Sequence, residues 1–156
     1  MNMNQAPEAV RFSSRLLNTT GREIQNSATL PLHTDEHVVG VRKVVREHAL
    51  ELKLSLVEQT KLVTAASELA RNTIKYGGGG MVLAQMLSDG VRRGLRLVFA
   101  DDGPGILDIE QALRDGFTSG GGLGLGLGGA KRLVDEFDID SRGGEGTAVA
   151  IIKWKK

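Results

Sequence analysis

One stretch of the chain says more about its fold than any other, and it reads Glu68-Leu69-Ala70-Arg71-Asn72-Thr73-Ile74-Lys75-Tyr76. Glu68 and Asn72 are four residues apart, so both project from one side of a helix, and Lys75 joins them three residues later. The apolar stripe of the same helix lies on its other side and uses Leu62, Val63, Ala66, Leu69, Ala70 and Ile74. A polar helix face is most often merely solvated, so this face alone predicts no function.

The segments before this helix predict a strand and a second helix. Residues 1–27 are polar and lack a sustained period, which predicts a poorly ordered N-terminal extension and leaves open a short strand near its end. A strand is predicted over residues 28–33. Thr34 is the expected N-cap of a helix whose apolar side carries Val38, Val41, Val45, His48 and Leu52. Ser55 and Glu58 then form a capping box at the start of the central helix, which residues 77–80, all glycine, bring to an end.

The segments after it predict a sheet. Residues 81–87 and 95–101 are apolar runs joined through Asp89-Gly90, which is typical of two antiparallel strands. Leu127, Ala130, Val134 and Phe137 mark a third helix, and strands are expected over residues 137–141 and 147–154. This order of elements predicts an α/β fold of the two-layer sandwich type, with helices covering a mixed, mostly antiparallel sheet.

Composition narrows the class of protein. The 156 residues suit one domain, and a formal net charge of +1 gives no general attraction to nucleic acid or membrane. The chain contains no cysteine, no apolar run long enough to span a bilayer and no secretory signal pattern, so a cytoplasmic location is expected. Its 3 histidines have no metal-ligand spacing.

Two further segments could carry chemistry. Asp101-Asp102-Gly103-Pro104-Gly105 follows directly on an apolar strand, where a carboxylate can accept hydrogen bonds and glycines admit a ligand close to the backbone. Taken alone, the segment is better explained as a tight Asp-Gly-Pro-Gly turn. Residues 120–129 form a glycine-rich run that enters a helix, and successive backbone N–H groups of this kind suit phosphates, although a flexible hinge is as good a reading.

The order of these segments, followed by Gly146-Thr147 on a final strand, resembles the GHKL superfamily of ATPases and kinases, which share the Bergerat ATP-binding fold. The superfamily includes gyrase-type and MutL ATPases, heat-shock chaperones, histidine kinases and anti-sigma-factor kinases. The resemblance covers residues 28–156 and implies that they form a single ATP-binding kinase domain. It implies ATP and Mg²⁺ as cofactors.

The resemblance also implies roles for residues. Glu68 matches the general base, Asn72 the magnesium-binding asparagine, and Lys75 a position that contacts phosphate. Asp101 matches the aspartate that accepts a hydrogen bond from the adenine amino group, and Thr147 the threonine that supports the adenine end. The remaining matches are the glycines beside the adenine, Gly103 and Gly105, and the glycines of the lid over the phosphates, Gly122, Gly124, Gly126 and Gly128.

Within the superfamily, residues 67–72, 124–137, 144–147 and 152–154 are most similar to the RsbT-like serine/threonine switch kinases of the stressosome. Such kinases phosphorylate STAS-domain proteins, either scaffolds or antagonists, and then activate a regulatory phosphatase. Two alternatives stay open: an anti-sigma-factor kinase, and a nucleotide-dependent binding module without turnover. The presence of Glu68 argues against the module, because an inert binder needs no base.

Overall fold

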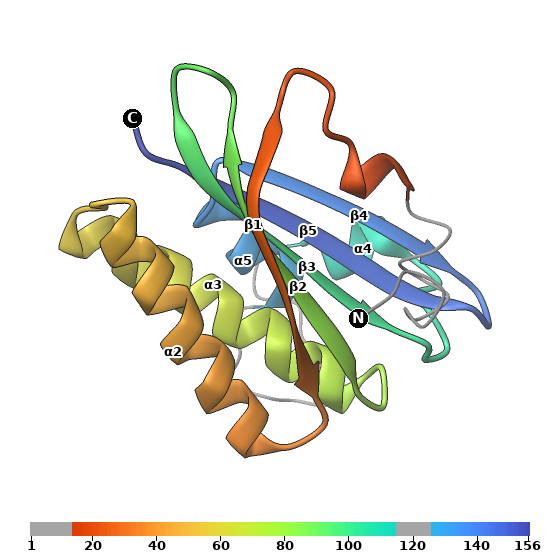
Figure 1. Cartoon of the computed structure of the whole chain (residues 1–156). Helices are drawn as coiled ribbons and strands as arrows, with labels where there is room; N and C mark the ends of the chain where they lie inside the picture. Colours follow the sequence, from red (N-terminus) through yellow and green to blue (C-terminus); the bar gives the residue numbers. More distant parts are fainter. Residues whose placement is uncertain (1–13, 115–125) are drawn as a thin grey trace.

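The structure is a computed structural model of the chain and describes residues 14–114 and 126–156. Its centre is a five-stranded sheet in the order β1-β2-β3-β5-β4 (Figure 1). The strands are β1 (Glu23–Leu32), β2 (Gly80–Ser88), β3 (Arg93–Asp101), β4 (Glu136–Arg142) and β5 (Gly146–Trp154). The register places Asp101, at the end of β3, beside Gly80 on β2 and Thr147 on β5.

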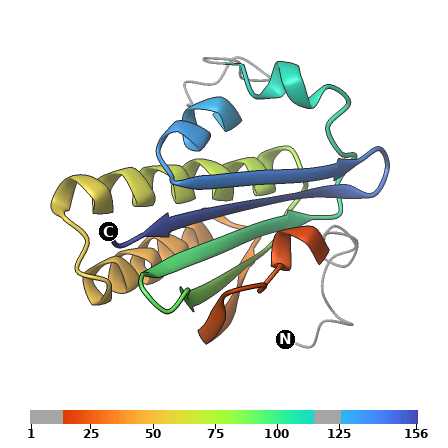
Figure 2. The same cartoon turned by 90° about the horizontal axis from the view of Figure 1, so that it is seen from above.

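Helices cover one face of this sheet, as Figures 1 and 2 show. They are α2 (Asp35–Glu51), α3 (Leu56–Lys75), α4 (Ile109–Ala112) and α5 (Gly126–Arg132). The predicted caps are present: Thr34 accepts from the amide of His37, and Ser55 accepts from the amide of Glu58. The main core lies between α2, α3, α5 and the inner sheet face, so the two-layer α/β sandwich is confirmed. In the described ranges, no helix has the length and apolar character needed to cross a membrane.

Three details differ from the sequence-based expectation. Between the described strands every pairing is antiparallel, so the sheet is not mixed. The first strand begins at Glu23, five residues earlier than predicted, and most of its side chains are exposed because β1 is an edge strand. The third helix ends at Arg132 rather than near Phe137. There the amide of Leu133 bonds to Ala130, and Phe137 belongs to β4.

The outer face of the sheet is also apolar, and residues 14–22 lie against it. These residues, here called the N-terminal arm, begin with the short 3₁₀ helix η2 (Ser14–Leu17). Leu16 is 3% exposed and packs with outer-face residues such as Val98. The buried guanidinium of Arg96 donates to the carbonyl of Asn18 at 2.7 Å. Part of the predicted extension is therefore in contact with the sheet.

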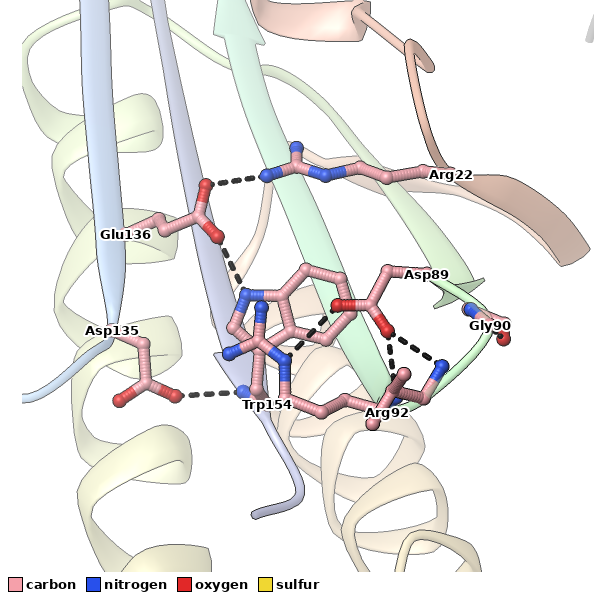
Figure 3. Close-up of polar contacts among 9 residues, drawn as sticks. Arg22, Asp89, Gly90, Arg92, Asp135, Glu136 and Trp154 are labelled. Atoms are coloured by element: carbon pink, nitrogen blue, oxygen red, sulfur yellow. Dashed lines mark hydrogen bonds and ion pairs between the residues drawn. The ribbon is translucent and has the colours of Figure 1, made fainter.

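The end of the arm meets the end of β5 (Figure 3). Arg22 donates to Glu136 at 2.8 Å, and Glu136 in turn accepts from the indole of Trp154. The guanidinium groups of Arg22 and Arg92 lie 5.4 Å and 4.4 Å from the centre of the Trp154 ring, within cation–π range. These contacts attach the arm to the core strand β5.

Candidate functional site

A cavity of about 690 Å³ opens where the C-terminal half of α3 meets the end of β3 and the start of β5. Residues 104–112 and the start of α5 complete its wall, and Phe99, Ile106, Leu127 and Val149 contribute apolar surface. Its size is in the range of small-molecule sites, which combine an apolar lining with a few placed polar groups.

Most of the residues singled out in the sequence meet in this cavity. The residues among them that line it are Glu68, Asn72, Lys75, Asp101, Gly105, Gly126 and Thr147. Gly103 and Gly128 are not among the lining residues, while Gly122 and Gly124 fall outside the described residues. Segments that are far apart in the sequence thus converge on one place.

Asp101 is the buried acid of the cavity. It is 7% exposed, and its Oδ1 accepts from the amide of Gly103 at 2.8 Å. Burial raises the pKa of its carboxyl, and the backbone amides of Gly103 and Thr147 act in the opposite direction. A carboxylate held in this way can accept a hydrogen bond from a donor on a ligand.

Gly77 is a site residue that the sequence analysis missed. A Cβ atom at Gly77 would lie 2.2 Å from Cγ of Asp101, so a side chain there would displace the carboxylate. A Cβ at Gly103 would lie 2.7 Å from Cα of Gly77, so glycine at both positions lets the two backbone segments approach each other. The signal was available, because residues 77–80 contain more glycines than the end of one helix requires.

Glu68 is buried rather than solvated. It is 7% exposed, and its Oε1 accepts from the amide of Gly126, the first residue of α5, at 3.0 Å. Arg71 lies 3.8 Å from the other carboxylate oxygen. The solvated-face interpretation is therefore wrong for Glu68, because α5 covers this part of α3. It holds for Lys75, which is exposed at the end of the helix.

The Thr147 side chain is held by a hydroxyl pair that the sequence did not reveal. Its Oγ1 lies 2.8 Å from Oγ of Ser141 on β4, and the amide of Ile106 donates to the same Ser141 oxygen at 2.7 Å. A Cβ at Gly105 would meet the carbonyl oxygen of Arg142 at 2.5 Å, and Gly105 has φ +80°. The loop after β3 is thus seated closely against the β4–β5 turn.

Gly128 acts through packing. A Cβ atom at this position would lie 2.2 Å from the carbonyl oxygen of Leu113, which follows α4. The glycine therefore lets α5 approach the end of α4 closely, and Leu127 beside it reaches the cavity.

Comparison with known proteins agrees with the family resemblance found in the sequence. The family of histidine kinase-like ATPase domains matches residues 32–153. Serine/threonine-protein kinase RsbT of Bacillus subtilis is 41% identical over 131 residues, which are 84% of this chain and 98% of RsbT. The anti-sigma F factor of Anoxybacillus flavithermus is 31% identical over 119 residues, or 72% of this chain and 80% of that protein.

A solved structure supports the fold. The RsbU and RsbW domains of a Mycobacterium tuberculosis protein superpose with a TM-score of 0.57 and 22% identity, over 83% of this chain and 32% of that one. The resemblance to GHKL kinases found in the sequence is thereby confirmed. The chain belongs to the histidine kinase-like ATPase domain family and is a homologue of the serine/threonine-protein kinase RsbT.

Proposed function

We propose that this protein is an ATP-dependent serine/threonine kinase that phosphorylates STAS-domain proteins in a bacterial stress-signalling partner switch. The observation that carries the proposal is the pair of buried acids, Asp101 and Glu68, which line one cavity of about 690 Å³. The 41% identity with a serine/threonine-protein kinase supports the reaction type.

In this proposal the Asp101 end of the cavity binds the adenine of ATP. Asp101 is buried, and the missing side chain of Gly77 leaves its carboxylate free to approach a ligand edge. In the proposed complex, Asp101 accepts from the adenine amino group, Thr147 supports the same end, and Gly103 and Gly105 keep the backbone close. The apolar side chains of Phe99 and Val149 suit the flat faces of a purine.

The Glu68 end suits the phosphates and Mg²⁺. Asn72 offers an amide oxygen to the metal and Lys75 a positive charge to a phosphate, and both line the cavity. Among the described residues no group of three or more histidine or acidic side chains could hold a metal alone, so phosphate oxygens would complete the coordination. When bound, Mg²⁺ neutralises charge on the transferred phosphoryl group. Gly126 would contribute backbone near the phosphates, as would Gly122 and Gly124 in the proposed lid, while Gly128 would support the lid by its packing against Leu113.

Glu68 is proposed as the general base. Its carboxylate accepts the proton of the attacking serine or threonine hydroxyl, whose oxygen forms the new bond to the γ-phosphorus as ADP departs. The contact between Glu68 and the amide of Gly126 fixes the orientation of the carboxylate and joins the base to the start of α5. Positioning and charge neutralisation supply most of the catalysis.

The test is Glu68→Gln, which keeps the shape of the side chain and removes the base. We expect ATP affinity to stay within about twofold and phosphotransfer to a STAS-domain protein from the same organism to fall roughly 10²–10⁴-fold. Exposed Glu47 on α2 gives the control Glu47→Gln, which should leave both quantities unchanged. Wild-type turnover by Glu68→Gln would remove the proposed base. Phosphate found only on histidine would refute the serine/threonine assignment, and absence of turnover in the wild type would favour the binding module.

The second candidate function is that of an anti-sigma-factor kinase, and the likeness to anti-sigma F factors at about 30% identity favours it. The proposed partners differ: a STAS-domain protein with a regulatory phosphatase in the first case, a sigma subunit in the second. Binding of purified sigma factor in the presence of ATP, measured by calorimetry against binding of the STAS-domain protein and the phosphatase, separates the two.

A further inference from the structure

Ser141 lies beside the cavity, near the end of β4. It is not among the lining residues, but its hydroxyl contacts two residues that are, Thr147 on β5 and Ile106 in the loop after β3. Strands β3, β5 and β4 lie side by side in that order (Figure 1). In their register, Thr147 pairs with Asp101 on one side and with Ser141 on the other. One row across the sheet thus connects Ser141 with the buried acid of the cavity.

The hydrogen bonds of Ser141 indicate where its own proton points. Its Oγ accepts from the amide of Ile106 at 2.7 Å. The Ser141 proton then has two oxygen atoms within reach, Oγ1 of Thr147 at 2.8 Å and the carbonyl oxygen of Gly146 at 3.3 Å. Hydrogen bonds between two oxygens in proteins span about 2.5–3.0 Å, so the proton goes to Thr147. If Thr147 were the donor instead, the Ser141 proton would keep only the longer contact.

This direction leaves the Thr147 hydroxyl as a donor toward the cavity. One lone pair of its oxygen accepts the Ser141 proton, and within the described residues the Thr147 hydroxyl has no hydrogen-bond partner other than Ser141. Thr147 lines the cavity, so its own proton can point to a ligand. The backbone amide of Thr147 meanwhile bonds to the carboxyl of Asp101. The cavity therefore presents an acceptor, Asp101, next to a donor, Thr147.

This pair of groups is complementary to one edge of adenine. Adenine offers the donor of its 6-amino group next to the acceptor N1, whereas guanine offers the acceptor O6 next to the donor N1–H. Asp101 and Thr147 can contact this edge directly or through one water molecule. In both cases they match adenine and oppose guanine at two positions. Opposed groups weaken binding strongly because buried polar atoms are left without partners.

We propose that Ser141 is a positioning residue that holds the Thr147 hydroxyl as a donor, and that it thereby makes the cavity select a 6-aminopurine without a hydrogen on N1. This inference deepens the proposed function and rests on the proposed binding of ATP in this cavity. The alternative is that Ser141 only seats the loop after β3, through its bond to Ile106. In that case the loss of its hydroxyl would weaken the binding of every nucleotide to the same extent.

The test compares ATP with isoguanosine triphosphate, which keeps the 6-amino group but carries a hydrogen on N1. Calorimetry with the full chain measures the affinity for both ligands in the wild type and in Ser141→Ala. We expect the wild type to bind ATP at least about tenfold more tightly, because the Thr147 proton opposes N1–H. In Ser141→Ala the Thr147 hydroxyl can turn and accept from N1–H. The preference for ATP should therefore fall about tenfold, mainly because isoguanosine triphosphate binds better.

Further variants separate a role in selection from a role in packing. Ser141→Thr keeps the hydroxyl and should restore the preference for ATP. Thr147→Val removes the donor and should lower the preference as Ser141→Ala does, and combining the two changes should lower it no further. The control is Ser88→Ala. It removes a hydroxyl that accepts from the amide of Gly90 at the other end of β2, and it should leave both affinities unchanged.

Circular dichroism shows whether each variant folds, and Ser141→Cys, whose thiol is a weak donor, serves if Ser141→Ala does not fold. The proposal is overturned if Ser141→Ala weakens both ligands equally, because Ser141 would then only seat the loop. It is also overturned if the wild type binds both ligands equally well. A wild type that bound neither ligand would refute the proposed nucleotide site itself, so failure of the proposed function is distinguishable from failure of the Ser141 inference.

Discussion

Asp101 is a carboxylate that the fold buries beside Gly77 and Gly103. Burial raises its pKa, which means that the ionised form is less favourable in the folded chain than in the unfolded one. The same ionised form is the acceptor that an adenine amino group requires. The residue proposed to bind the nucleotide thus reduces the stability of the empty protein.

Asp101→Asn separates these two effects. The amide can present a donor where an acceptor is needed, so we expect ATP affinity to fall at least about tenfold in calorimetry. The empty variant should unfold at a higher temperature than the wild type at pH 7, because it carries no buried charge. Glu47→Gln, at an exposed acid on α2, is the control and should change neither quantity appreciably.

The pH dependence follows from the direction of the pKa shift. The raised pKa of Asp101 makes the folded chain hold its proton at pH values where the unfolded carboxyl, with its ordinary pKa of 3.8, has lost it. The wild type therefore loses stability as the pH rises through that window. The advantage of Asp101→Asn should shrink as the pH is lowered toward 4. An advantage that did not depend on pH would show that charge burial is not its cause.

Gly77→Ala tests the close approach to Asp101. The added Cβ would lie 2.2 Å from Cγ of Asp101, so the carboxylate must move. We expect about tenfold weaker ATP binding with the fold retained. The control is Gly143→Ala, where a Cβ would meet nothing within 4 Å. Equal affinity for wild type and Gly77→Ala would mean that the carboxylate can shift without consequence.

At the residue scale, the sequence identified the polar groups of the site but not their surroundings. The spacing from Glu68 to Lys75 and the acid after an apolar run were visible because they depend on local periodicity. The burial of Glu68 under α5 and the pairing of Thr147 with Ser141 depend on distant segments. No local pattern encodes such contacts, so they could not be predicted.

Among the elements, α3 carries Glu68, Asn72 and Lys75, and its N-cap lies far from all three. Ser55→Ala removes the hydrogen bond to the amide of Glu58 and should lower the free energy of unfolding by about 1 kcal/mol. For a chain of this size we expect a fall in Tm of about 3 °C. ATP affinity should be unaffected.

Ser55→Asp serves as the control because aspartate caps equally well and should retain the wild-type Tm. A loss of ATP affinity in Ser55→Ala would show that the start of α3 influences the nucleotide cavity more than its distance suggests.

Elements with a strong hydrophobic period could be predicted from the sequence. Elements whose exposure depends on their position in the sheet could not. The two long helices and strands β2 and β3 carry continuous apolar patterns, and their predicted bounds agree with the structure within two residues. Strand β1 is an edge strand whose side chains from Glu23 to Ala28 are exposed, so its early residues show no apolar alternation. The apolar residues after Arg132 continue a helical spacing although the chain turns into β4 there.

For the molecule as a whole, we predict that the N-terminal arm belongs to the cooperatively folding unit. Leu16→Ala should lower the free energy of unfolding by about 2–3 kcal/mol, the cost of truncating a buried leucine. Leu17, its partly buried neighbour, provides the matched control, and Leu17→Ala should cost less than half as much. Chemical denaturation measures both.

ATP affinity should be the same in the two variants, since neither leucine lines the cavity. An unchanged unfolding free energy in Leu16→Ala would mean that the arm does not belong to the cooperative unit, and that the predicted boundary at residue 28 describes the domain better.

Trp154, which the arm contacts, and Tyr76, which lines the cavity, are two intrinsic fluorescent probes in different parts of the protein. The chain contains 1 tryptophan and 1 tyrosine. Trp154 is buried between Arg22 and Arg92, whereas Tyr76 lines the nucleotide cavity. Trp154 and Thr147 are seven residues apart on β5, or about 23 Å, so a ligand in the cavity does not touch the indole. Tryptophan emission therefore reports on the contact between the arm and β5, and tyrosine emission reports on the cavity, so the two regions can be followed in one cuvette without a label.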